Sequence, residues 1–153
     1  MPFSIASSEF RSGGNIPRDF TADGKDSSPT LAWDNPPAGT RAFALTCDDP
    51  DAPVGTWIHW VIWNLPSVAR GLPPGVQKVR TLADGSIQGK NDFGRIGYNG
   101  PCPAPGKPHR YFFRLFALRE TLFLAGGASR ADLDRAMIGK ILGSAVFFGI
   151  YQR

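Results

Sequence analysis

Residues 57–66, WIHWVIWNLP, are the stretch from which the fold of this 153-residue chain can be argued most directly. The run is apolar on both faces, so it is expected to lie within a sheet that is covered on each side. A helical period would also tolerate the pattern, but its β-branched and aromatic side chains and the proline at its end favour a strand. We therefore predict a central strand at residues 57–65.

Two further runs have the composition of strands. Residues 41–47, RAFALTC, precede the central strand, and residues 109–118, HRYFFRLFAL, follow it. The segment at residues 92–108 is dense in glycine and in proline, which cannot donate a ladder hydrogen bond, so it is predicted to be a loop. The chain's 18 glycines and 14 prolines are distributed along the whole sequence, where they separate short segments from one another. This spacing is typical of a β-rich domain.

One helix is predicted near the C-terminal end, with Ser129 suited to cap its first turn. Its apolar stripe recurs every four residues, at Leu133, Met137 and Ile141. Gly143 is suited to the position after the helix, and residues 144–151 then form a last strand or an extended tail. No repeat, low-complexity tract or boundary divides the chain, so we predict a single domain over residues 1–153.

Composition restricts the class of function. Lysine and arginine exceed aspartate and glutamate by 17 − 13 = 4, a mild and scattered excess that no nucleic-acid-binding motif accompanies. The start has no signal-peptide pattern, and no apolar run approaches the roughly 18 residues of a membrane-spanning helix. We therefore expect a cytoplasmic protein with no nucleic-acid partner and no membrane insertion. In that compartment Cys47 and Cys102 are expected to be reduced thiols.

The polar residues that do not suit a core gather around the chain's two histidines. Residues two apart share a face in a strand, so His59 is expected to lie on one face with Trp57, Val61 and Trp63. By the same rule His109 shares a face with Tyr111. Asp49 and Asp51 point the same way if their segment is extended. However, an aspartate before a proline is also ordinary turn chemistry, because its side chain can bond the backbone two residues on.

Three chemistries could use this set. A metal ion could be held by Asp49, Asp51 and a histidine, although no dedicated ligand spacing is present. Cys102 could act as a thiol nucleophile with His109 as its base, which together with the metal reading gives a hydrolase as the alternative function. Imidazole and tyrosine hydroxyl groups could instead donate to phosphate or carboxylate oxygens. The aspartates would then orient an imidazole or meet a cationic group on the same ligand.

Three motifs, in order, resemble the phosphatidylethanolamine-binding protein family in its bacterial Raf-kinase-inhibitor-like branch, the YbhB/YbcL type. They are IPRDFTADGKDSSPTLAW at residues 16–33, DPDAP with the following WIHWVIWNLP at 49–66, and GYNGPCPAPGKPHRYFFRLFAL at 97–118. The helix and the ending GIYQR at 149–153 also match the bacterial tail. The resemblance covers nearly the whole chain, and three motifs at the right distances are very specific.

The resemblance implies a mainly β fold, with two packed antiparallel sheets and a few short helices. It also implies a small pocket that accepts phosphate, phosphorylated head groups and small anions such as acetate. The pocket residues that it implies are Asp49, Asp51, Trp57, His59, Gly100, Pro101, Pro103, His109 and Tyr111. Trp57 would form an apolar wall, and the glycine and two prolines would shape the rim.

The function expected from the resemblance is binding. We expect a protein that captures a small anionic or phosphorylated ligand and modulates a partner protein such as a kinase or a protease. No enzyme activity, catalytic residue, cofactor or metal is expected. Bacterial members often look like homodimers, so a homodimer is expected as well.

Overall fold

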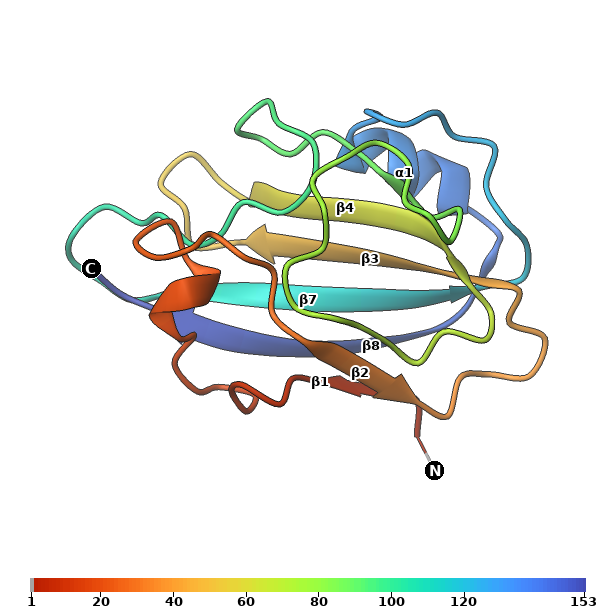
Figure 1. The fold of residues 1–153 in the computed structure, drawn as a ribbon, viewed down its shortest axis with the longest axis horizontal. Coiled ribbons are helices and arrows are strands. Elements are labelled where there is room, and N and C mark those ends of the chain that lie inside the picture. Colours follow the sequence, from red (N-terminus) through yellow and green to blue (C-terminus); the bar gives the residue numbers. More distant parts are fainter. Residues whose placement is uncertain (1) are drawn as a thin grey trace.

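A five-stranded antiparallel sheet forms the centre of the computed structural model, which describes residues 2–153. In spatial order its strands are β6 (Ile87–Gln88), β4 (Trp57–Pro66), β3 (Ala42–Asp49), β7 (His109–Leu118) and β8 (Ile141–Tyr151) (Figure 1). A second, three-stranded antiparallel sheet contains β1 (Ser4–Ala6), β2 (Leu31–Asp34) and β5 (Gly71–Leu72). The predicted fold class, mainly β with two packed antiparallel sheets, is confirmed.

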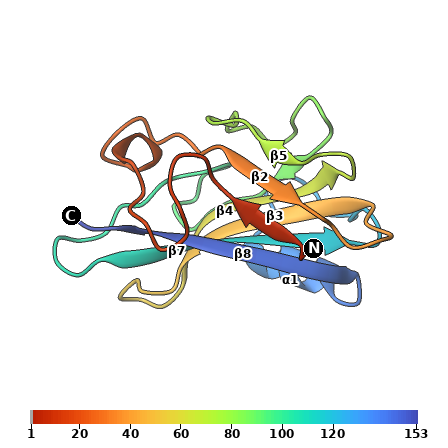
Figure 2. The ribbon, with the colours of Figure 1, turned by 90° about the horizontal axis from the view of Figure 1, so that it is seen from below.

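The five-stranded sheet is covered on both faces, as Figure 2 shows. The small sheet packs on one face, and the main hydrophobic core lies between the two sheets. The helix α1 (Arg130–Met137) lies on the opposite face, above a smaller core to which it contributes Leu133 and Met137. A one-turn 3-10 helix, η1 (Arg18–Phe20), precedes β2. Among residues 2–153 there is no helix with the length and hydropathy needed to cross a bilayer.

The three longest runs of apolar sequence form the strands predicted for them. β4, β3 and β7 cover residues 57–66, 42–49 and 109–118, and every residue of β3 is buried. Such complete burial requires a covering layer on each face, which explains why β3 and the middle of β4 do not alternate between apolar and polar residues. Residues 92–108 form an irregular loop, as their glycines and prolines predicted.

The helix begins as predicted and ends earlier. Ser129 Oγ accepts a hydrogen bond from the backbone N–H of Asp132 at 3.1 Å, and the aspartate bonds back to complete a capping box. The prediction that Ile141 continues the helix is wrong, because α1 ends at Met137 and Ile141 begins β8. Gly139 makes the turn between them, with a φ of +76° that favours glycine.

A β-bulge changes the face on which part of β4 lies. Cys47 of β3 pairs with Trp60, and the next residue, Asp48, pairs with Ile58, so His59 is an extra residue in the ladder. Consequently His59 and Trp60 both lie toward the main core side. Val61 and Trp63 face α1 instead, and the prediction that they share a face with His59 is wrong.

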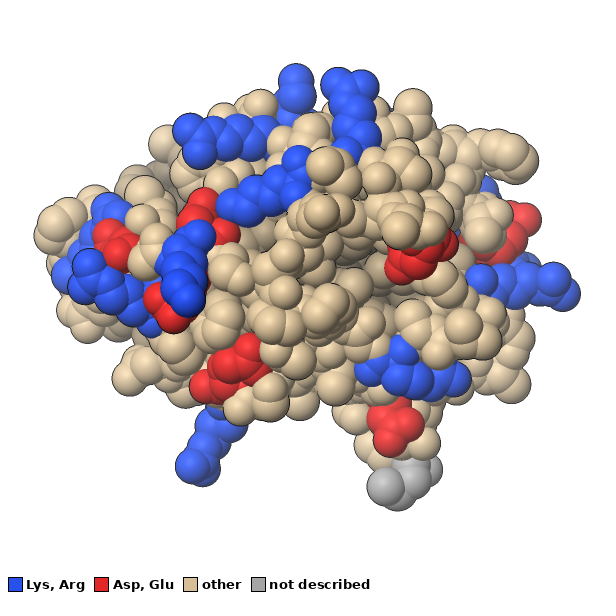
Figure 3. All heavy atoms as spheres, in the orientation of Figure 1, with Lys and Arg blue, Asp and Glu red and all other residues tan. Residues whose placement is uncertain are grey.

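Charged side chains do not form one continuous basic area on the face shown in Figure 3. Lysine and arginine side chains lie around its periphery, interspersed with acidic ones, and its centre is largely uncharged. The excess of four positive charges is therefore distributed on this face rather than concentrated.

Candidate functional site

A cavity of about 230 Å³ lies at the end of the five-stranded sheet where β3 ends and β7 begins. Figure 1 shows the loops after β3 and before β7 at this end, beside the C terminus. Six of the residues predicted for the site line this cavity: Asp49, Trp57, His59, Pro103, His109 and Tyr111. The sheet thus brings together side chains that lie up to about sixty residues apart, as the 49-to-109 pair does.

Asp49 orients His109. The Nδ1–H of His109 donates to Asp49 Oδ2 at 2.6 Å, and both side chains are almost completely buried. The other carboxylate oxygen of Asp49 accepts the backbone N–H of Asp51 at 2.8 Å, which is the turn bond expected of an aspartate before a proline. Because Nδ1 is engaged, Nε2 is the ring nitrogen of His109 that remains for a ligand.

Tyr111 lies close to both imidazole rings. Its ring centroid is 5.2 Å from that of His59, in an edge-to-face arrangement, and 6.4 Å from that of His109, in a stacked one. The residue is fully buried, and its hydroxyl has no hydrogen-bond partner among residues 2–153. Burial, and next the charge of Asp49, raise the pKa of Tyr111 above its usual range, so the phenol keeps its proton. An unpaired buried donor in a cavity is a group that a ligand could satisfy.

His59 is held by the backbone of the following loop. Its Nδ1 lies 2.6 Å from the carbonyl oxygen of Asn99, and because a carbonyl only accepts, Nδ1 carries the proton. Burial lowers the pKa of His59, although this hydrogen bond opposes the shift. The neutral ring therefore keeps an unprotonated Nε2, which can accept a hydrogen bond from a ligand.

The lowered pKa of His59 predicts how stability depends on pH. The unfolded chain binds a proton at this residue near pH ~6.5, before the folded protein does, so protonation favours unfolding. The free energy of unfolding is expected to decrease as the pH falls below about 6.5, and His59→Asn should reduce this decrease while keeping a donor for the Asn99 carbonyl. Urea unfolding of both proteins at pH about 7.5 and 5.5 measures it. An equal pH dependence in the two proteins would contradict a buried neutral His59.

Asp51 lies outside the cavity. Its carboxylate accepts three hydrogen bonds from Arg110, namely from the backbone N–H, Nε and Nη2, each at 2.9 Å. The side-chain hydrogen bonds of Arg110 lower the pKa of Asp51 to about 2. The two predicted site aspartates therefore have different partners, because the chain turns after Asp49 instead of remaining extended. Asp51 lines a neighbouring hollow with Lys107 and Arg110.

Gly100 and Pro101 support the site without lining the cavity. A Cβ on Gly100 would lie 2.4 Å from the carbonyl oxygen of Phe20, so only glycine permits this close approach of two loops. The carbonyl of Pro101 accepts the N–H of Ala22 at 3.0 Å. These two predicted rim residues thus fix the loop that precedes Cys102 and Pro103.

Asp26 is a positioning residue that the sequence interpretation missed. Its carboxylate accepts from Gly100 N at 2.6 Å and from Asn99 Nδ2 at 2.8 Å. It thereby holds the peptide whose carbonyl binds His59. No local pattern distinguishes Asp26 from other loop aspartates, because Asn99 and Gly100 lie more than seventy residues away along the chain.

The remaining walls of the cavity are mostly apolar and were also missed. They come from the loops on either side, as Ala52, Pro53, Val54, Phe93, Cys102 and Ala104. The Phe93 ring packs edge-on against both Trp57 and His59, at centroid distances of 5.6 and 5.3 Å. The two cysteines are free thiols, with Cys47 buried and Cys102 exposed beside the cavity.

The geometry gives no support to a metal-dependent hydrolase. Across residues 2–153, no group of three histidine, cysteine, aspartate or glutamate side chains is placed to hold a metal ion. Asp51 is engaged by Arg110, and Nδ1 of His109 is engaged by Asp49. The thiol alternative depends on Cys102, for which no hydrogen bond to His109 is found among the same residues.

Comparison with known proteins places this geometry in context. A family model described as phosphatidylethanolamine-binding protein matches residues 6–152. A UPF0098 protein of Methanothermobacter thermautotrophicus is 50% identical over 144 residues, which cover 94% of this chain and 95% of that protein. The UPF0098 protein YbhB of Escherichia coli is 40% identical, covering 94% of this chain and 90% of YbhB. The crystal structure of E. coli YbcL, described as a new member of the mammalian PEBP family, matches with a TM-score of 0.91 and 31% identity over 100% of this chain and 99% of that one.

Proposed function

Because this chain belongs to the phosphatidylethanolamine-binding protein family, in the branch with YbhB and YbcL, we propose that its cavity binds small anions, above all phosphate and phosphorylated head groups. One observation carries the proposal. The buried Tyr111 hydroxyl has no partner among the described residues, and the Tyr111 ring packs beside two histidines that also line the cavity. The protein acts in this proposal as a binding protein, not as an enzyme.

The donors and acceptors of the cavity suit a ligand that carries both. Tyr111 donates through its hydroxyl, and His109 donates through Nε2 to an anionic oxygen when both of its ring nitrogens carry a proton. The neutral His59 offers an acceptor instead, so it favours a ligand that still has a proton to donate. A singly protonated phosphate has such a proton, and so does a phosphate ester with a nearby ammonium group.

The size of the cavity restricts the ligand as well. About 230 Å³ is at the small end for ligand pockets and suits a phosphate or a short head group rather than a whole lipid. The apolar side chains of Trp57 and Phe93 line part of the cavity and offer a surface to the carbon atoms of a short head group. O-Phosphorylethanolamine is therefore a suitable probe beside inorganic phosphate.

Two aspartates provide a matched test of this site. Asp49→Asn removes the carboxylate that accepts from Nδ1 of His109 and orients its ring, so phosphate affinity is expected to fall by about tenfold. Asp51→Asn removes the same charge at a residue that faces Arg110, so the affinity should change by less than about twofold. Isothermal titration with inorganic phosphate measures both. Equal losses in the two variants would indicate a general charge effect and would count against the proposed site.

The remaining parts of the proposal concern the cell. We propose a cytoplasmic location, a homodimer, and a partner protein such as a kinase or a protease whose activity the anion-bound form modulates. Sedimentation equilibrium tests the dimer directly. A monomer at all accessible concentrations would remove that part and leave the anion site unaffected.

A further inference from the structure

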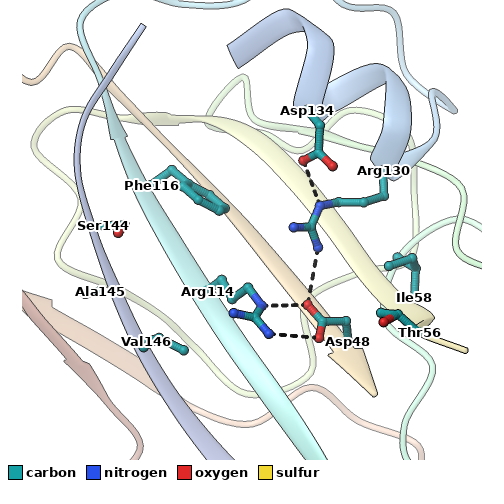
Figure 4. A pocket seen from close by; sticks show the side chains of 10 residues that line it. All are labelled: Asp48, Thr56, Ile58, Arg114, Phe116, Arg130, Asp134, Ser144, Ala145 and Val146. Carbon is teal, nitrogen blue, oxygen red and sulfur yellow. Dashed lines mark hydrogen bonds and ion pairs between the residues drawn. The ribbon is translucent and has the colours of Figure 1, made fainter. Parts of the chain in front are cut away.

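A second cavity, of about 500 Å³, lies on the other face of the five-stranded sheet (Figure 4). Successive strand residues point to opposite faces, so Asp48 and Arg114 face this outer cavity while Asp49 and Tyr111 face the inner one. The first turn of α1 forms one wall, through Arg130, and β8 forms the other. None of its lining residues belongs to the inner cavity.

The outer cavity contains two arginines and two aspartates, of which only Asp48 is buried. Asp48, only 2% exposed, accepts from Arg114 Nε at 2.8 Å and Nη2 at 3.3 Å, and from Arg130 Nη1 at 3.3 Å. Two guanidinium groups thus share the one buried carboxylate of the cavity. Arg130 also pairs with Asp134 at 2.8 Å, but the side chain of Asp134 is 51% exposed, so water weakens its influence.

Each arginine has one terminal nitrogen free for a ligand. Arg114 Nη1 and Arg130 Nη2 make no hydrogen bond to any of residues 2–153, whereas their other nitrogens are engaged. In Figure 4 these two nitrogens point away from Asp48, toward the side of Phe116 and β8. The hydrogen bonds to Asp48 hold both guanidinium groups in place before any ligand arrives, which reduces the entropy lost on binding.

Apolar surface adjoins the two guanidinium groups. The Phe116 ring and the side chains of Ile58 and Val146 line the same cavity. Val146 is 55% exposed, so part of this surface is in contact with water. Burial of such surface by a ligand would be favourable.

We propose that the outer cavity binds a small organic carboxylate with an apolar ring or chain. The carboxylate accepts from Arg114 Nη1 and Arg130 Nη2, the two terminal nitrogens that have no partner among residues 2–153. The apolar part covers Phe116 and Val146. The apolar part distinguishes this ligand class from the phosphate proposed for the inner cavity.

Benzoate is the probe, and His109→Asn is the background in which the inner cavity is impaired. Titration followed by backbone amide NMR is expected to shift signals of α1 and β8 in a saturable way. Arg130→Gln should weaken binding by about tenfold or more, because it removes a charged donor. Asp134→Asn removes the exposed carboxylate beside Arg130, so it should strengthen binding by about twofold at low salt. Arg119→Gln, an exposed arginine outside both cavities, is the control and should leave the affinity unchanged.

Each outcome has a definite meaning for the outer site. Absence of saturable shifts in α1 and β8 would overturn the proposal, and so would equal affinity in Arg130→Gln and Arg119→Gln. Acetate lacks the apolar part, so acetate that binds as tightly as benzoate would overturn the role of Phe116 and Val146. Arg130→Lys keeps the positive charge but loses the planar guanidinium group with its several N–H donors, so it should bind benzoate more weakly than the wild-type protein. An unchanged melting temperature of this variant would show that the fold is retained.

Discussion

A His109→Asn variant is expected to bind inorganic phosphate about ten- to a hundredfold more weakly than the wild-type protein. The asparagine amide lies close to the position of Nδ1, so the hydrogen bond to Asp49 can be kept. What the substitution removes is Nε2, the nitrogen that would donate to the anion. A charged hydrogen bond of this kind contributes about 1.5–3 kcal/mol, which is the basis of the expected loss.

His109→Gln is the matched variant, because its amide lies near the position of Nε2 and abandons that of Nδ1. It should retain more of the affinity than His109→Asn does, and isothermal titration with phosphate measures the difference. Thermal unfolding of both variants shows whether the fold is retained. Wild-type affinity in His109→Asn would exclude Nε2 as a ligand contact, and equal losses in both variants would indicate that His109 acts only through the fold.

Phe113→Ala is expected to lower the free energy of unfolding by about 3–5 kcal/mol. Phe113 is completely buried on the inner face of β7, between the two sheets. Its ring stacks on Phe147 at a centroid distance of 5.1 Å and lies 6.3 Å from Phe10. Removal of the ring leaves a cavity that the rigid sheets can close only in part.

The chain offers an exposed phenylalanine as the control. Phe123 has a relative exposure of 102%, so Phe123→Ala removes no packed contact and should change stability by less than about 0.5 kcal/mol. Urea unfolding with a common m-value compares the two variants. Similar losses in both would contradict a core placed between the two sheets.

The strands could be predicted because their signal is local. The sequence of β4 is rich in β-branched and aromatic side chains, and that of β7 is rich in aromatic ones. The middle of β4 is buried on both faces, so it requires no alternation of apolar and polar residues. The residue at which α1 ends could not be predicted from the local sequence. The spacing of Ile141 fits a helix, but pairing of β8 with β7 along its whole length takes that residue into the sheet. A strong long-range interaction here overrides a weak local periodicity.

The site shows the same division between local and long-range causes. His109 and Tyr111 share a face because β7 alternates regularly, and this was predicted from spacing. The place of His59 depends on a bulge that its own sequence does not signal, since the bulge arises from the pairing with β3. Asp51 turns to Arg110, fifty-nine residues away, and Asp26 supports the site from a distant loop. Such long-range hydrogen bonds form only once the chain is folded, so the local sequence does not predict them.

The most direct test of the anion site follows the imidazole signals of the two histidines by NMR while inorganic phosphate is added to the wild-type protein. The cavity geometry predicts that the signals of both His59 and His109 shift and saturate together, with one dissociation constant. O-Phosphorylethanolamine should compete for the same shifts. Signals that remain unchanged at millimolar phosphate would contradict the account.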